Sequence, residues 1–163
     1  MARGIAVTFA YAGHSVVLID LKKRDAADSA TMAAAALVEI EATLRNMASL
    51  GLFAESSVAP IVARISLATE SQAAATLPTA AFIFECVPEV VDLKREVLRR
   101  TSAMASPQAI IASTTSTIVV NDLACATANP RRFLNSHYLN PAFLVPLVEL
   151  SRETKPIRRW WRS

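Results

Sequence analysis

A histidine and a glutamate near the C-terminal end of the chain are the residues best suited to chemistry. His137 lies near the end of the run Phe133 to Tyr138 (FLNSHY), a predicted strand, and open α/β sheets bind ligands at strand ends. Glu149 follows after a segment framed by Pro141 and Pro146, which could return its carboxylate to the imidazole. A carboxylate on one ring nitrogen fixes the tautomer and prepares the other nitrogen for proton transfer. The pair predicts a general base, with a structural histidine as the alternative.

Two further polar residues fall beside predicted strands. Asp20 ends the run Ser15 to Asp20 (SVVLID), and in dinucleotide-binding folds an acid at the end of the second strand accepts hydrogen bonds from the adenosine ribose. Ser116 lies in the turn STTST between a predicted strand and a predicted helix. The alternatives are a solvated acid at a strand end for Asp20, and helix capping for Ser116.

Strands and helices alternate along the chain. We expect strands over residues 15–20, 65–69, 80–85, 109–113 and 133–138. We expect helices over residues 1–12, 26–50, 57–64 and 118–126, and another opened by Pro88 and Glu89. This alternation predicts an α/β fold, a doubly wound parallel sheet with helices on both faces.

Composition excludes several classes of protein. The 163 residues are 53% hydrophobic, which suits one compact domain. The net charge is +3, and Arg158, Arg159 and Arg162 lie at the very end, so the rest lacks the basic face of a nucleic-acid binder. Cys86 and Cys125 form no metal or disulfide pattern, and we interpret Cys86 as a small hydrophobe rather than a nucleophile. No apolar run reaches the roughly 18 residues of a membrane span, so we expect a cytoplasmic protein without a membrane partner.

Four segments, in order, resemble the 3-hydroxyacyl-CoA dehydrogenase family. The helix and second strand after that family's glycine-rich turn resemble RGIAVTFAYAGHSVVLID. Its E-A-V-P-E-x-x-x-L-K segment is similar to ECVPEVVDLKREVL, and its A-S-N-T-S-S-L segment to IIASTTSTI. Its H-F-x-N-P-x-x-x-M-x-L-V-E segment resembles HYLNPAFLVPLVEL. The resemblance implies a Rossmann-type NAD-binding domain over residues 1–150, closest to the bacterial 3-hydroxybutyryl-CoA dehydrogenases.

The resemblance also implies an activity and a set of site residues. The reaction is NAD-dependent oxidation of an L-3-hydroxyacyl-CoA, such as 3-hydroxybutyryl-CoA, to the 3-ketoacyl-CoA in fatty acid metabolism. His137 takes the proton of the C3 hydroxyl, Glu149 orients the imidazole, and Ser116 binds the substrate oxygen. No metal is implied. The expected cofactor contacts are Asp20, Glu89, Lys94, Ser116 and Asn140.

Some of these positions carry alternatives or departures. Glu89 and Lys94 are five positions apart, a spacing that disfavours pairing on one helix, so we expect both to contact ligands, with Lys94 also able to meet CoA phosphates. Asn140 could instead form an Asx turn before Pro141. Thr114 stands where the family usually has Asn, so an amide near the substrate is lost or replaced by a hydroxyl.

The two ends are expected to depart from the family. Met1 aligns inside the glycine-rich turn, so we expect the first strand and the pyrophosphate loop to be missing, and NAD affinity with them. Past residue 150 the family continues into a helical domain through which full-length relatives dimerise. Residues 151–163 are instead expected to form an atypical basic tail with Trp160 and Trp161. A non-catalytic remnant, or a related dehydrogenase of small hydroxy acids or sugar acids, remains an alternative.

Overall fold

A computed structural model describes residues 1–152 of the chain. It divides into two compact units. The first unit comprises Met1–Thr76 and Leu139–Pro146, and the second comprises Leu77–Tyr138 and residues 147–152. No helix in this part of the chain is long and apolar enough to cross a membrane. The expected basic tail, with Trp160 and Trp161, lies outside the described residues.

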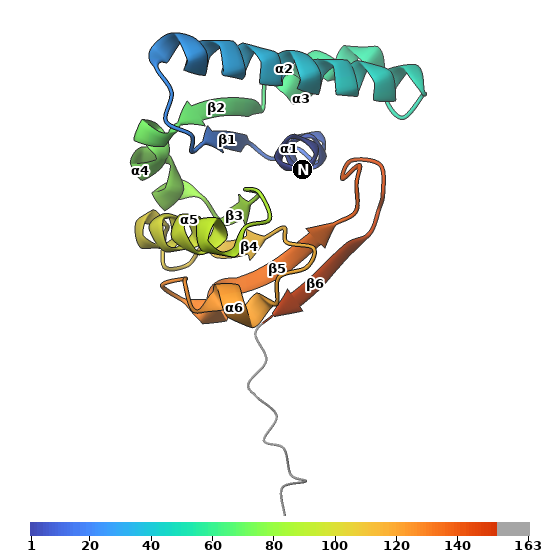
Figure 1. The fold of residues 1–163 in the computed structure, drawn as a ribbon. Coiled ribbons are helices and arrows are strands. Elements are labelled where there is room, and N and C mark those ends of the chain that lie inside the picture. The colour runs from blue at the N-terminus through green and yellow to red at the C-terminus, as the bar shows by residue number, and fades with distance from the viewer. Residues whose placement is uncertain (153–163) are drawn as a thin grey trace, which may run out of the picture. The chain divides into compact units, whose positions relative to one another are not determined.

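The first unit joins helices to a two-stranded parallel sheet (Figure 1). Gly13 ends the first helix because its φ of 95° lies in the left-handed region that favours glycine. The side chain of Asp25 caps the second helix by accepting a hydrogen bond of 2.8 Å from the Asp28 amide. The elements are α1 (Ala2–Tyr11), β1 (Val16–Asp20), α2 (Ala26–Ser49), η1 (Glu55–Ser57), α3 (Val58–Val62), β2 (Ile65–Thr69), η2 (Glu70–Gln72) and α4 (Ala73–Thr76).

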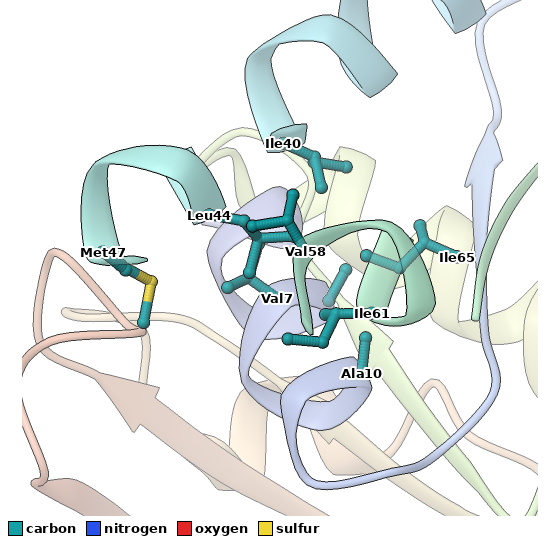
Figure 2. Close-up of a cluster of buried hydrophobic side chains, with 9 residues drawn as sticks. Val7, Ala10, Ile40, Leu44, Met47, Val58, Ile61 and Ile65 are labelled. Carbon is teal, nitrogen blue, oxygen red and sulfur yellow. The ribbon is translucent and has the colours of Figure 1, made fainter. Parts of the chain in front are cut away.

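One apolar cluster holds the helices of the first unit together (Figure 2). Ile40, Leu44 and Met47 lie at positions i, i+4 and i+7 of α2 and therefore on one face of that helix. They pack with Val7 and Ala10 of α1, Val58 and Ile61 of α3, and Ile65 of β2. The apolar spacing of the predicted helices thus packs them against Val16 and Leu18 of β1, the strand that ends at Asp20.

The second unit is a four-stranded sheet with the strand order β3-β4-β5-β6 (Figure 1). The first three strands are parallel, and β6 runs antiparallel to β5. Leu98 of α5 and Leu123 of α6 pack with Ile111 and Phe133 in a second apolar cluster. The elements are η3 (Leu77–Thr79), β3 (Phe82–Glu85), α5 (Val91–Met104), β4 (Ile110–Ser113), α6 (Val120–Ala124), η4 (Pro130–Arg132), β5 (Phe133–Tyr138) and β6 (Val148–Arg152).

The predicted α/β class is confirmed, and all five predicted strands form with ends shifted by about two residues or fewer. Strand β6 was not predicted as an antiparallel strand, although its residues Val148–Ser151 alternate between apolar and polar side chains; all five residues of β6 are exposed. The helix expected to open at Pro88 and Glu89 begins instead at Val91. The strands make two sheets, one in each unit.

Candidate functional site

The hairpin of β5 and β6 places His137 directly opposite Glu149. The imidazole Nδ1 lies 2.8 Å from the Oε2 of Glu149. A carboxylate only accepts hydrogen bonds, so Nδ1 is the donor in this contact, and the neutral tautomer that donates from Nδ1 has its lone pair on Nε2. The His137 side chain is 24% exposed and that of Glu149 64% exposed, so a ligand can reach the pair. The expected return of the carboxylate to the imidazole is confirmed.

The register of β6 against β5 determines the contact between His137 and Glu149. The antiparallel pairing runs from Leu134 opposite Arg152 to Tyr138 opposite Val148. Because successive side chains of a strand point to opposite faces, a slip of one residue would carry Glu149 to the face away from His137. The loop between the strands, framed by two prolines, therefore sets the geometry of the pair as much as the two residues do.

The parallel strands of the second unit bring three predicted site residues to one edge of the sheet. Strand β3 ends at Glu85 and β4 at Ser113, and the turns that follow carry Glu89 and Ser116. His137 lies near the carboxyl end of β5, the neighbour of β4. The carboxyl ends of parallel strands share an edge, and this edge is where open α/β sheets bind ligands.

Glu89 binds the turn that carries Ser116. Its Oε1 accepts hydrogen bonds from the amides of Ser116 (3.0 Å) and Thr117 (3.1 Å), and from the hydroxyls of Thr117 (3.1 Å) and Thr115. Burial alone would raise the pKa of Glu89, but these hydrogen bonds lower it to about 2. Glu89 is therefore a carboxylate at neutral pH.

Ser116 is exposed in the middle of this turn. Its amide is held by Glu89, while the amide of Ile118 donates to the hydroxyl of the neighbouring Thr115 at 3.0 Å. This hydrogen bond closes the turn before α6, which begins at Val120 without a side-chain cap, so capping by Ser116 is not seen. The Ser116 side chain lies in that turn, after the carboxyl end of β4.

Lys94 is buried, with 1% of its side chain exposed. Its Nζ donates to both carboxylate oxygens of Glu85, at 3.0 and 3.2 Å, and to the carbonyl of Val87 at 3.0 Å. It also lies 3.5 Å from Oε2 of Glu89. The expectation that Glu89 and Lys94 do not pair is wrong, because Glu89 lies before α5 begins and helical spacing does not apply to it. Contact of Lys94 with cofactor or CoA phosphate stays a prediction, since its donors face protein acceptors here.

Glu85 is the residue that sequence reasoning missed. It is buried and accepts hydrogen bonds from the amide of Val87 (2.7 Å) and the hydroxyl of Ser113 (2.6 Å), besides those from Lys94. A signal existed in AAFIFE, where a lone acid ends an otherwise apolar predicted strand. A buried carboxylate needs a cation and donors nearby, and Lys94 follows in the next helix.

Asp20 ends β1 in the first unit. Its Oδ2 accepts a hydrogen bond of 2.7 Å from Nε of Arg24, and its Oδ1 accepts one of 3.1 Å from the amide of Lys22. Burial by itself would raise the pKa of Asp20, but these two hydrogen bonds lower it. The side chain is 40% exposed. An ionised, reachable carboxylate at the carboxyl end of a parallel strand fits the hydroxyl donors of a ribose.

Asn140 belongs to the segment 139–146 of the first unit and is exposed. This segment packs against α1: the hydroxyl of Thr8 donates to the carbonyl of Ala142 at 3.3 Å. A Cβ placed on Gly4 would meet the Ala142 methyl at 3.2 Å, so glycine allows the close approach. Both roles considered for Asn140, cofactor contact and Asx turn, stay predictions.

Burial raises the pKa of the Cys86 thiol, which disfavours the reactive thiolate and agrees with its interpretation as a small hydrophobe. Within residues 1–152, no group of three or more His, Cys, Asp or Glu side chains is arranged to hold a metal ion.

Comparison with known protein families gives one match over almost the whole chain. The NAD-binding domain of 3-hydroxyacyl-CoA dehydrogenases matches residues 1–157. The 3-hydroxybutyryl-CoA dehydrogenase of Bradyrhizobium diazoefficiens is 33% identical over 152 residues, which cover 93% of this chain and 48% of that protein. The L-carnitine dehydrogenase/betainyl-CoA thioesterase of Rhizobium meliloti is 44% identical over 82 residues, which cover 48% of this chain and 16% of that protein.

Solved structures similar to this chain include another 3-hydroxybutyryl-CoA dehydrogenase. The crystal structure of (S)-3-hydroxybutyryl-CoA dehydrogenase from Ralstonia eutropha superposes with a TM-score of 0.80 at 28% identity. The match covers 92% of this chain and 50% of that one. The chain therefore spans about half the length of these 3-hydroxybutyryl-CoA dehydrogenases.

Proposed function

The chain belongs to the 3-hydroxyacyl-CoA dehydrogenase family, within its NAD-binding domain, and from this we propose that it supplies the general base and part of the cofactor site of an NAD-dependent oxidoreductase. The proposed substrate is an L-3-hydroxyacyl-CoA, with 3-hydroxybutyryl-CoA favoured by the names of the relatives. The contact between His137 and Glu149 is the observation that carries the proposal.

The proposed proton transfer uses both nitrogens of His137. Glu149 accepts the Nδ1 hydrogen, which leaves the Nε2 lone pair to take the proton of the C3 hydroxyl. NAD, when bound, accepts the hydride that leaves C3, and the oxygen becomes the ketone. The Glu149 carboxylate then faces an imidazolium and stabilises its charge. Ser116, exposed in its turn at the same edge of the sheet, would donate a hydrogen bond to the substrate oxygen.

The proposed cofactor contacts are Asp20, Glu89, Ser116 and Asn140. Asp20 would accept hydrogen bonds from the adenosine ribose, a role supported by its ionised state and its position at the end of β1. Glu89, Ser116 and Asn140 would contact the nicotinamide side of NAD. Lys94 would act on that side through Glu89, because its ammonium is buried against the two glutamates.

A second candidate substrate is a small 3-hydroxy acid without CoA. The local identity of 44% to a protein named for L-carnitine dehydrogenase activity favours this candidate. The same His137 and Glu149 chemistry would serve it, because only the C3 hydroxyl takes part. The two candidates differ in what binds around the rest of the substrate.

A chimera tests the proposed function, because the chain spans about half of each 3-hydroxybutyryl-CoA dehydrogenase compared. In it, residues 1–152 replace the matching half of the Ralstonia eutropha enzyme. We expect NADH formation with L-3-hydroxybutyryl-CoA and a loss of roughly 10²–10⁴-fold in kcat for His137→Gln, with NADH affinity kept. The control is His14→Gln, since His14 is exposed in the first unit.

The same assay separates the alternatives. Turnover of L-carnitine in preference to the acyl-CoA would favour the second candidate. Near-normal kcat in His137→Gln would contradict the proposed base. Glu149→Gln should cost less in a His137→Gln background than alone, because residues that act as one unit are not additive.

A further inference from the structure

A network of charged side chains lies under the turn that carries Ser116. Lys94 stands between two carboxylates, at 3.0 Å from Glu85 and 3.5 Å from Glu89. Each carboxylate also accepts hydrogen bonds from one end of the same segment, residues 113–117. Glu85 accepts from the hydroxyl of Ser113, the last residue of β4, and Glu89 accepts from residues 115–117. The segment 113–117 is therefore tied at both ends to one buried ammonium.

Burial makes this arrangement costly in desolvation free energy, so stability alone is a weak reason for it. The side chains of Lys94 and Glu85 are each 1% exposed. Desolvation of a buried ion pair offsets much of its attraction, and apolar residues of similar size often stabilise a core equally well. The better-attested benefit of such a pair is that it selects one geometry. The geometry selected here is that of the segment 113–117.

Glu89 transmits this geometry to Ser116. Its Oε2 faces Lys94 and its Oε1 receives four donors from Thr115, Ser116 and Thr117. A rotation of the carboxylate away from Lys94 would break several of these hydrogen bonds together. The hydroxyls of Thr115 and Thr117 donate to Glu89, whereas the exposed side chain of Ser116 in the middle of the turn is open to a ligand.

We propose that Glu85, Lys94 and Glu89 are positioning residues that hold the Ser116 hydroxyl in place for the substrate oxygen. This inference deepens the proposed function and rests on it for the role of Ser116. It assigns Glu85 a positioning role in the site, and it gives Lys94 and Glu89 the same role whether or not they also contact the cofactor.

Amide hydrogen exchange in the 163-residue chain tests the geometric part. In Glu89→Gln, we expect the amides of Ser116 and Thr117 to exchange about tenfold faster or more, while amides within β5 keep their rates. The charge-neutral double variant Glu85→Gln/Lys94→Met should give the same pattern and guards against misfolding from a lone buried charge. The matched control is Glu96→Gln, which removes an exposed partner of Arg99 on α5, the helix of Lys94. Unchanged exchange at Ser116 and Thr117 in both variants would overturn the proposal.

A double-mutant cycle in the chimera tests the functional part. Loss of the hydrogen bonds from Glu89 should lower kcat by about tenfold in Glu89→Gln. In a Ser116→Ala background the same change should lower kcat less than about twofold, because the hydroxyl it positions is gone. Additive losses would overturn positioning through Ser116. A normal kcat in both Ser116→Ala and His137→Gln would instead contradict the proposed function, and the exchange experiment would still decide the geometry.

Discussion

The two units hold their acidic site residues in different ways. Asp20 in the first unit is 40% exposed and binds partners two and four positions away, the Lys22 amide and the Arg24 side chain. Glu85 in the second unit is 1% exposed and binds Lys94 and Ser113, nine and 28 positions away. The contacts of Asp20 are local and open to solvent, whereas those of Glu85 are buried and reach as far as the neighbouring strand β4.

This difference in burial distinguishes an acid that can bind a ligand, Asp20, from an acid that fixes the geometry of the protein, Glu85. A surface ion pair contributes roughly 0–1 kcal/mol, so a ribose hydroxyl can compete for the Asp20 carboxylate at little cost. Removing one partner of a buried pair costs about 3–5 kcal/mol, because the other charge is left without compensation. The Glu85–Lys94 pair is thus suited to keep its geometry while ligands come and go.

The sharpest test removes the cation from each pair in turn. Lys94→Met should lower the free energy of unfolding by about 3–5 kcal/mol, since Glu85 stays buried and charged. Arg24→Met, the matched change at the surface pair, should lower it by about 1 kcal/mol or less. Urea denaturation of each variant measures both. Equal losses would mean that burial does not distinguish the two pairs.

Cofactor selectivity tests whether the exposed carboxylate faces a ligand. In the chimera, Asp20→Ala should raise the Kd for NADH by about tenfold or more, since charge-assisted hydrogen bonds contribute roughly 1.5–3 kcal/mol. It should also narrow the preference for NADH over NADPH, because the carboxylate no longer repels the 2′-phosphate. Calorimetric titration of both cofactors gives the ratio. An unchanged ratio would leave Asp20 as an ordinary acid at a strand end.

Acid stability tests the hydrogen bonds of Glu89. Folding lowers its pKa from 4.5 to about 2, so its contribution is fully present above about pH 4.5 and is lost as the pH falls toward 2. The side chain is 38% exposed, and solvent screening reduces that contribution to about 1–2 kcal/mol. Glu89→Gln should remove this part of the pH dependence of urea unfolding between pH 4.5 and 2. A slope equal to that of the wild type would show that Glu89 is not held as the hydrogen bonds indicate.

Local patterns in the sequence were enough to predict most helices and strands and part of the candidate site. The apolar spacing of residues 40, 44 and 47 marks one face of α2, and the short run at Phe133–Tyr138 marks a buried strand. Asp20 and His137 were found because they fall at the ends of such runs. The contact of His137 with Glu149 was predicted because two prolines frame the loop between them.

Contacts that depend on how the chain turns between elements could not be predicted in this way. The alternation of apolar and polar residues in β6 does not say which strand it pairs with, so its antiparallel direction followed only from its pairing with β5. Glu89 and Lys94 were expected not to pair because their spacing was judged as if both lay on one helix.

By itself, the sequence determined the α/β class, the strand ends that carry Asp20 and His137, and the family resemblance. These depend on periodicity and on motifs, which neighbouring residues set. Only the tertiary structure decided that Lys94 turns inward to Glu85 and that Glu89 binds the turn of Ser116. The physical reason is that a buried ammonium needs carboxylates around it. Here the turn from β3 into α5 folds Glu85 and Glu89 around Lys94, and the adjacent parallel strand β4 brings the turn of Ser116 to the same edge of the sheet.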